Sequence, residues 1–202
     1  MKVRRFAMPR AYSLVGALLV GSCWPSGALA QEHDAHMMTS QHQPQTADQR
    51  KQGNALVKIV RDATERFSDV SVAENEGYGL LFGCVSGGDY GAMGLHFVNF
   101  PLVTDGKIDA AAPEIVLYEP TSNGRLRITG ADFVVLAADW DRTHPSAPEL
   151  NGQLFHFFES PNRFGLPPFY TLHVWAWKDN PNGTFTNWNP SVSCDGFNGR
   201  NP

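Results

Sequence analysis

The order of apolar and polar positions divides the chain into a helical first part and a strand-rich second part. Between residues 47 and 68, apolar side chains from Leu56 to Phe67 recur at helical spacing. Thr46 and Gln49 match a capping box at the start of this segment. The pattern therefore predicts one amphipathic helix over residues 47–68, with Phe67 buried at the end of its apolar stripe.

From residue 80 onward, short apolar runs alternate with turn residues, as is typical of β-strands. Strands are predicted at residues 80–85, 94–100, 114–119, 126–137, 171–178 and 184–188, with a bulge at Gly130. Residues 139–168 contain five prolines and are predicted to form a long connection. One helix followed by strands with short turns indicates an α+β fold. We expect an N-terminal helix packed on an antiparallel β-sheet or a partly closed β-barrel.

Residues 1–30 have the composition of a secretory signal peptide. Four basic residues precede an apolar run at 12–20 that is too short to span a bilayer. Ala28 and Ala30 then supply the small residues of a cleavage site, so we expect cleavage before Gln31. This interpretation predicts a periplasmic or secreted protein.

Two further parts follow the predicted cleavage site. Residues 31–46 are polar and lack Val, Ile, Leu and aromatic residues, which predicts a disordered tail. Residues 47–202 have the length of a single α+β domain. Loss of the four basic signal residues changes the formal net charge from −4 to −8, which argues against nucleic acid as a partner. No later apolar run reaches membrane-spanning length, so a small-molecule ligand remains the candidate partner of a soluble protein.

The cysteines become an even pair once the signal peptide is removed. Cys23 is lost with the signal, and Cys84 and Cys194 remain. An oxidising compartment favours a disulfide between them. The alternative is a pair of buried free thiols.

Several short stretches of the β-rich part form a recognisable combination. They are Met93-Gly-x-His96, Pro113-Glu-x-x-x-Tyr-Glu-Pro120, and LHVWAW from Leu172, followed by NPxG and by WNPxVSC ending at Cys194. The combination resembles exported bacterial proteins of unknown function. The resemblance covers roughly residues 67–194. It implies that these residues occur together, and it implies no activity.

Two histidines and two glutamates form a candidate site. His96 and His173 lie in predicted strands among apolar neighbours, while Glu114 and Glu119 lie on opposite faces of one strand. One of these glutamates therefore points inward, where a carboxylate needs a cation, a metal or a histidine. We expect His96, His173 and either glutamate to bind one divalent transition metal: Zn, Cu, Fe or Mn.

Other residues are candidates for roles around this site. Asn99 and Tyr118 are predicted to donate hydrogen bonds near it. His156, in a phenylalanine-rich stretch of the long connection, is a candidate catalytic acid–base group.

The sequence leaves the function of this small pocket open. The site could be a metal-free acid–base site, or its histidines could be purely structural. A further alternative is a non-catalytic periplasmic binding protein for a small apolar or sugar ligand, using an aromatic face that includes Trp175 and Trp177. Whether the protein is an enzyme also stays open.

Overall fold

The computed structural model describes residues 46–199. The predicted signal peptide and residues 31–45 of the predicted tail lie outside the described residues. Among residues 46–199, no helix combines the length and the apolar character that crossing a bilayer requires.

The predicted N-terminal helix is present as α2 (Ala47–Thr64), and it continues as the 3₁₀ turn η1 (Glu65–Ser68). The Thr46 hydroxyl accepts a hydrogen bond from the backbone N–H of Gln49, and the Gln49 side chain accepts one from the backbone N–H of Thr46. The capping box is therefore confirmed. Phe67 is buried, as the apolar stripe predicts.

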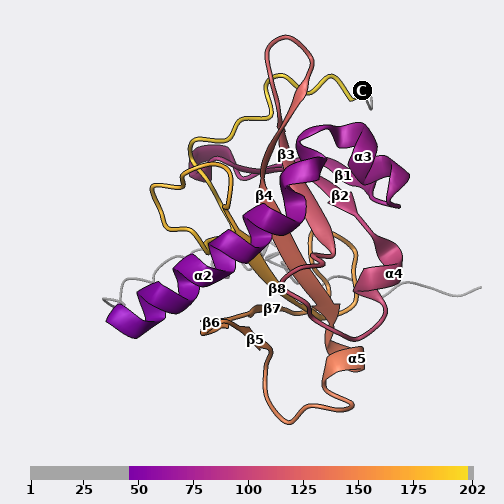
Figure 1. Cartoon of the computed structure of the whole chain (residues 1–202). Coiled ribbons are helices and arrows are strands. Elements are labelled where there is room, and N and C mark those ends of the chain that lie inside the picture. Colours follow the sequence, from indigo (N-terminus) through magenta and orange to yellow (C-terminus); the bar gives the residue numbers. More distant parts are fainter. Residues whose placement is uncertain (1–45, 200–202) are drawn as a thin grey trace, which may run out of the picture. The chain divides into compact units, whose positions relative to one another are not determined.

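Six strands form one antiparallel sheet in the order β1-β2-β3-β4-β8-β7 (Figure 1). The strands are β1 (Gly79–Ser86), β2 (Ala92–Val98), β3 (Ile115–Pro120), β4 (Leu126–Leu136), β7 (His156–Phe158) and β8 (Phe169–Val174). The shorter elements are α3 (Val70–Asn75), η2 (Gly88–Tyr90), α4 (Phe100–Val103), α5 (Ala137–Trp140), β5 (Glu149–Leu150) and β6 (Gln153–Leu154). The sheet curls into a half-barrel, so the predicted α+β fold class is confirmed.

Two predicted segments differ from the structure. Residues 184–188 do not form a strand, because the Asn180 side chain donates hydrogen bonds to Thr186 Oγ1 and to the carbonyl of Trp188. These local bonds replace a strand ladder with a turn. The connection over residues 139–168 is more ordered than predicted. Its β7 strand pairs with β8 and extends the sheet.

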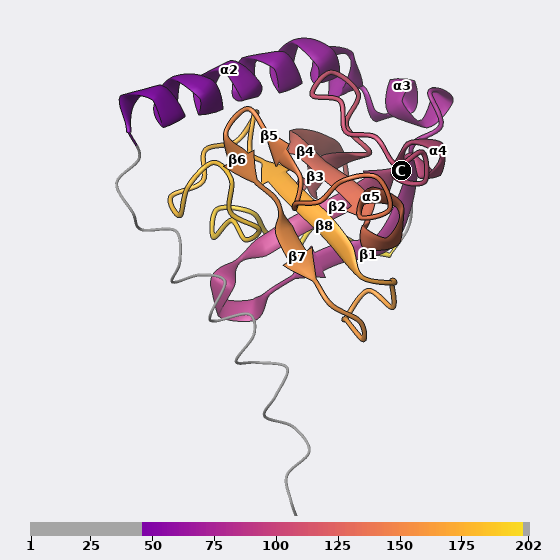
Figure 2. The ribbon, with the colours of Figure 1, turned by 90° about the horizontal axis from the view of Figure 1, so that it is seen from below.

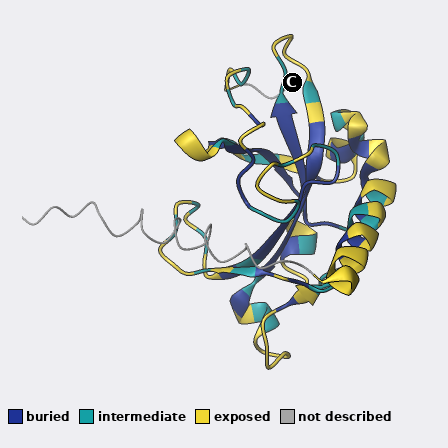
Figure 3. Cartoon of the chain, turned by 90° about the vertical axis from the view of Figure 1, so that its left-hand side faces the viewer, coloured by how far each residue is buried: buried dark blue, intermediate teal, exposed yellow. Residues whose placement is uncertain are grey.

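One face of the sheet packs against α2, which lies across it in Figure 2. Leu56 of α2 is fully buried in one core cluster with Phe133 of β4 and Leu172 of β8. Figure 3 shows the same division on α2, where buried positions lie toward the sheet and exposed ones away from it. The residues that alternate with Phe133 and Leu172 point to the opposite face of the sheet.

The predicted bulge in β4 determines which residues reach that opposite face. Leu117 of β3 pairs with Gly130, but the next residue, Tyr118, pairs with Ile128, so one residue of β4 is extra. Gly130 is required there, because a Cβ atom would lie 2.2 Å from the carbonyl oxygen of Val174. The bulge reverses the alternation along β4. Residues with odd numbers therefore face α2 after the bulge, and Asp132 points away from it.

Candidate functional site

The face of the sheet opposite α2 lines a cavity of about 60 Å³. Four lining residues are polar: His96, Asp132, Thr171 and His173. The other lining residues are apolar: Leu81, Phe82, Met93, Val98, Phe100, Val103, Ile115, Val134, Leu136, Phe158, Phe164, Leu166 and Phe169. The cavity is thus an apolar pocket with one polar cluster, which is the usual composition of a small-molecule site.

The polar cluster contains three side chains that could ligate a metal. His96 comes from β2, Asp132 from β4 and His173 from β8, and one ligand atom from each lies within 4.8 Å of the others. The imidazole rings of His96 and His173 are 5.8 Å apart between centroids. All three residues are at most 4% exposed. The structure thus brings the two sequence-predicted histidines together in a buried group.

The sheet places these side chains by register and by curvature. Asp132 and His173 are direct partners in the antiparallel pairing of β4 with β8, so their side chains share one face. His96 lies beyond β3, in register with Leu117, and the curl of the half-barrel brings its ring over that strand.

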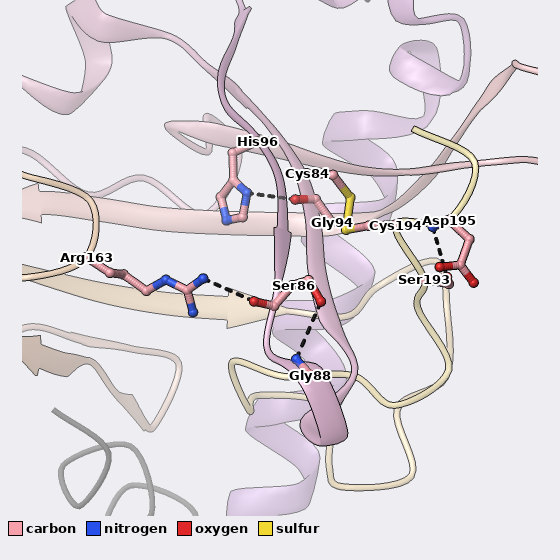
Figure 4. The surroundings of a disulfide bond; sticks show 9 residues. All are labelled: Cys84, Ser86, Gly88, Gly94, His96, Arg163, Ser193, Cys194 and Asp195. Carbon is pink, nitrogen blue, oxygen red and sulfur yellow. Dashed lines mark hydrogen bonds between the residues drawn. A yellow bond between two sulfur atoms is a disulfide. The ribbon is translucent and has the colours of Figure 1, made fainter. Parts of the chain in front are cut away.

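A glycine fixes the orientation of His96. Gly94 has a φ of +87°, and a Cβ atom there would lie 2.4 Å from the carbonyl oxygen of Tyr118. The carbonyl oxygen of Gly94 is 3.2 Å from Nδ1 of His96 (Figure 4). A hydrogen bond to a carbonyl requires a proton on Nδ1, so the lone pair of this imidazole is on Nε2. A histidine held in this way has the tautomer that metal ligation through Nε2 needs.

Asp132 has a hydrogen-bond partner, whereas His173 has none. The Thr171 hydroxyl donates to Asp132 Oδ1 at 2.5 Å. Nδ1 of His173 lies 3.4 Å from the same oxygen, within ion-pair reach, but neither ring nitrogen makes a hydrogen bond of acceptable geometry. Two buried polar atoms without partners cost stability, and such atoms in a native structure often mark a site that takes a ligand.

Burial keeps both imidazoles neutral at pH 7. It lowers the pKa of His96 to about 4, although the Gly94 carbonyl opposes the shift. It also lowers the pKa of His173 well below its ordinary value, and the neighbouring His96 adds to that effect. Burial raises the pKa of Asp132 to about 7, against the hydrogen bond from Thr171. Two neutral nitrogens beside a carboxyl that titrates near neutrality are suitable for binding a cation.

The group offers two nitrogen ligands and one oxygen ligand. Two histidines and one carboxylate are a set that binds Zn²⁺ in catalytic sites and Fe²⁺ in non-haem oxygenases, with positions left for water or substrate. Ligands at about 2.1 Å from one tetrahedral ion lie about 3.4 Å apart, so binding contracts the longest pair by up to about 1.4 Å.

The two glutamates of the sequence-based hypothesis lie elsewhere. Glu119 forms ion pairs with Arg127 and Lys178. The Glu114 carboxylate accepts a hydrogen bond of 3.0 Å from the backbone N–H of Val134. Neither glutamate is among the described residues that line the pocket, and the carboxylate of the group comes from Asp132 instead.

The residues predicted around the site have other partners. Tyr118 donates to the carbonyl of Phe67 at 2.7 Å, on the face that packs against the helices. The Asn99 side chain donates to the carbonyl of Glu76 at 3.2 Å. His156 is half-buried on β7 as the strand partner of Thr171, and burial lowers its pKa, but it does not line the pocket.

The predicted aromatic face is largely enclosed. Trp175 and Trp188 are 3% and 6% exposed, so their rings are covered by protein. Trp177 is partly buried against the core and donates through Nε1 to Thr64 Oγ1. The aromatic residues that border a cavity are phenylalanines of the pocket.

The predicted disulfide joins Cys84 and Cys194, which are 110 residues apart (Figure 4). It ties the C-terminal segment to β1, beside a second irregularity in strand pairing between Leu81 and Cys84. The prediction made from the even number of cysteines is confirmed.

The sequence-based hypothesis missed Asp132. This residue stands between Ala131 and Phe133 in the apolar run of β4, and a charged residue in such a run is itself a signal. Although the sequence indicates a bulge at Gly130, the register of that bulge decides the face of Asp132, and simple alternation from the start of the strand assigns this residue to the wrong face.

Comparisons with known proteins do not identify a family: no family model matches the chain, and neither a curated protein nor a solved structure matches it.

Proposed function

We propose that the protein binds one divalent transition metal ion through His96, Asp132 and His173. The observation that carries this proposal is the convergence of three buried ligand atoms within 4.8 Å at one point of an apolar pocket. A bound cation would give one ring nitrogen of His173 and the Asp132 carboxylate a role that the protein alone does not supply.

The position of the group supports a reactive site more than a purely structural one. Structural zinc sites usually have four protein ligands, whereas this group supplies three and borders a cavity. Bound there, a metal ion would polarise or activate a molecule held in the pocket. Thr171 would hold the Asp132 carboxylate in place through its hydrogen bond.

Export is part of the same proposal. The signal-like features of residues 1–30 and the disulfide between Cys84 and Cys194 both fit an oxidising compartment. We infer that the protein acts outside the cytoplasm on a small molecule.

The test is metal content and metal affinity of the purified chain that begins at Gln31. A tag without histidine is used, and His33, His36 and His42 are replaced by Gln in every sample, so that the N-terminal segment adds no ligands. After chelation, the protein is titrated with Zn²⁺, Mn²⁺, Fe²⁺ and Cu²⁺, and bound metal is measured by mass spectrometry and calorimetry. We expect one equivalent of at least one metal.

Substitutions test whether the three residues of the group bind the metal. His96→Ala, His173→Ala and Asp132→Asn should each weaken binding by at least about 100-fold while circular dichroism stays unchanged. His144→Ala is the matched control, because His144 is exposed and stacks on Trp140 away from the pocket. Absence of stoichiometric binding to the parent protein, or equal binding to the three variants, overturns the proposal.

A further inference from the structure

The walls of the pocket select for an apolar ligand. Five phenylalanines contribute to its lining, together with aliphatic residues from four strands. The described lining residues include no Lys, Arg or Glu, so a ligand with several hydroxyls or charges would lose hydration without finding partners. This composition disfavours sugars and polyvalent anions.

The size of the cavity limits the ligand to at most one ring. A volume of about 60 Å³ is several times the roughly 10–15 Å³ that one water molecule needs, and less than half of the roughly 150 Å³ of an enclosed cavity that binds benzene. A ring would therefore lie partly outside the cavity, against the side chains of Phe82 and Phe100, which are 41% and 53% exposed. The polar atom of the ligand would have to meet His96, Asp132 and His173, because Thr171 is the one other polar residue among the described lining residues.

Phe82 is held at the pocket by an unfavourable backbone conformation. Its φ is +67°, in the left-handed region that residues other than glycine seldom adopt, and it lies in the irregular pairing between Leu81 and Cys84. Phe82 is 41% exposed as a residue, and its ring packs against that of Phe164 with 5.4 Å between centroids. Core packing does not account for this conformation, and strain of this kind is concentrated at ligand sites.

The surroundings of this segment keep the strained conformation in place. Cys84 follows two residues later and is tied by the disulfide to Cys194. The ring of Phe197 lies 3.3 Å from the position that a Cβ atom on Gly83 would occupy. The C-terminal segment thus braces the bulge that presents Phe82.

We propose that the pocket binds a small, neutral, ring-bearing molecule that directs a single oxygen atom toward His96, Asp132 and His173, with Phe82 packing on the ring. The direction of the oxygen rests on the proposed metal site. The binding of the ring rests on the apolar walls and on Phe82, independently of any metal.

Three probes separate these parts: phenol and toluene, which are matched in size, and glucose, which is a larger polyhydroxylated ring. Binding is measured by saturation-transfer NMR and calorimetry on metal-free and metal-loaded protein. We expect phenol and toluene to bind metal-free protein within about threefold of each other, and phenol to bind metal-loaded protein at least about tenfold more tightly than toluene. Glucose should not bind either form.

Two variants test whether the ring of the ligand packs on Phe82. Phe82→Ala should weaken toluene binding at least about fivefold. Tyr90→Ala, which removes an equally exposed aromatic ring outside the pocket, should leave toluene binding unchanged. Equal effects of the two variants would overturn the assignment of Phe82.

The outcomes also separate this proposal from the metal site. If metal binds but neither phenol nor toluene does, or if glucose binds instead, the apolar-ligand proposal is overturned and the metal site stands. If phenol and toluene bind with equal affinity to metal-loaded protein, the direction of the oxygen is overturned. If toluene binds and no metal does, the metal site fails while the ring site stands.

Discussion

Residues of β8 and of the segment just after it lie in two environments that differ in hydrogen bonding. On the face covered by α2, Trp177 donates to Thr64, and Thr64 donates to the carbonyl of Val60. On the pocket face, His173 is equally buried and both its ring nitrogens lack hydrogen bonds. Thr129 Oγ1 and Asn187 Oδ1 are also buried without partners, but among these described residues His173 is the one that lines the pocket, where a ligand could satisfy it.

Two buried carboxylates, Glu119 and Asp132, also differ in whether the fold supplies them with partners. Glu119 is paired with Arg127 and Lys178, so its charge is compensated within the fold. Asp132 has a hydroxyl and an imidazole beside it but no Lys or Arg among its ion-pair partners in residues 46–199. Burial raises the pKa of Asp132 to about 7, so without a cation this carboxyl is neutralised by a proton, which a bound cation would replace; Glu119 needs neither.

The largest change in the free energy of unfolding is expected for a substitution on the helix-covered face. Leu172→Ala should lower the free energy of unfolding by about 2–5 kcal/mol, because Leu172 is 1% exposed and its removal leaves a cavity in the core. Urea denaturation of metal-free protein measures the change. Leu154→Ala, at a position that is 66% exposed, should change it by no more than about 0.5 kcal/mol. A loss below about 1 kcal/mol for Leu172→Ala would contradict the packing of α2 on this face.

The helix-covered face is also the part that the sequence predicts well. The spacing from Leu56 to Phe67 and the capping box at Thr46 are local features, and local features are sufficient to define a helix and its buried stripe. The strand at residues 184–188 was wrong for a local reason as well, since the side chain of Asn180 forms the turn.

The arrangement of residues on the pocket face depends on long-range features of the sheet. The spacing of residues along the sequence does not reveal these features. His96 and His173 lie on strands separated by β3 and β4, so their approach requires the order and the curl of the sheet. Asp132 reaches the same face because one extra residue before Gly130 reverses the alternation. The histidines could be selected from the sequence as polar residues in apolar strands, but identifying Asp132 as their carboxylate partner also requires the register of the bulge, of which the sequence indicates only the position, Gly130.

On the pocket face, we expect a substitution to change the free energy of unfolding by a smaller amount and in the opposite direction. His173→Leu should raise the free energy of unfolding of metal-free protein by about 1–3 kcal/mol, because it removes two buried nitrogens that lack partners. Urea denaturation in the presence of a chelator tests this. His144→Leu, at an exposed position, serves as the control and should be within about 0.5 kcal/mol of the parent. Destabilisation by more than about 1 kcal/mol would mean that His173 is a structural residue with satisfied contacts.

The last prediction concerns Glu114, a carboxyl that is 2% exposed and lies immediately before β3. Burial raises its pKa to about 8, against the hydrogen bond from the Val134 N–H. The folded state therefore holds a proton that the unfolded state releases near pH 4.5, so the stabilisation is complete below that pH and is lost as the pH rises toward 8.

The Glu114→Gln side chain keeps an oxygen that can accept the hydrogen bond from the Val134 N–H, but it cannot ionise. From pH 5 to 8 in chelator, the parent protein should lose stability relative to Glu114→Gln by up to about 1.4 kcal/mol per pH unit. Urea denaturation of both proteins at each pH gives the difference. A difference that stays constant, or that favours the parent as the pH rises, would show that Glu114 is ionised in the folded state. A buried charge without a Lys or Arg partner would then exist outside the pocket, and the contrast drawn between Asp132 and Glu119 would no longer point to a cation at Asp132.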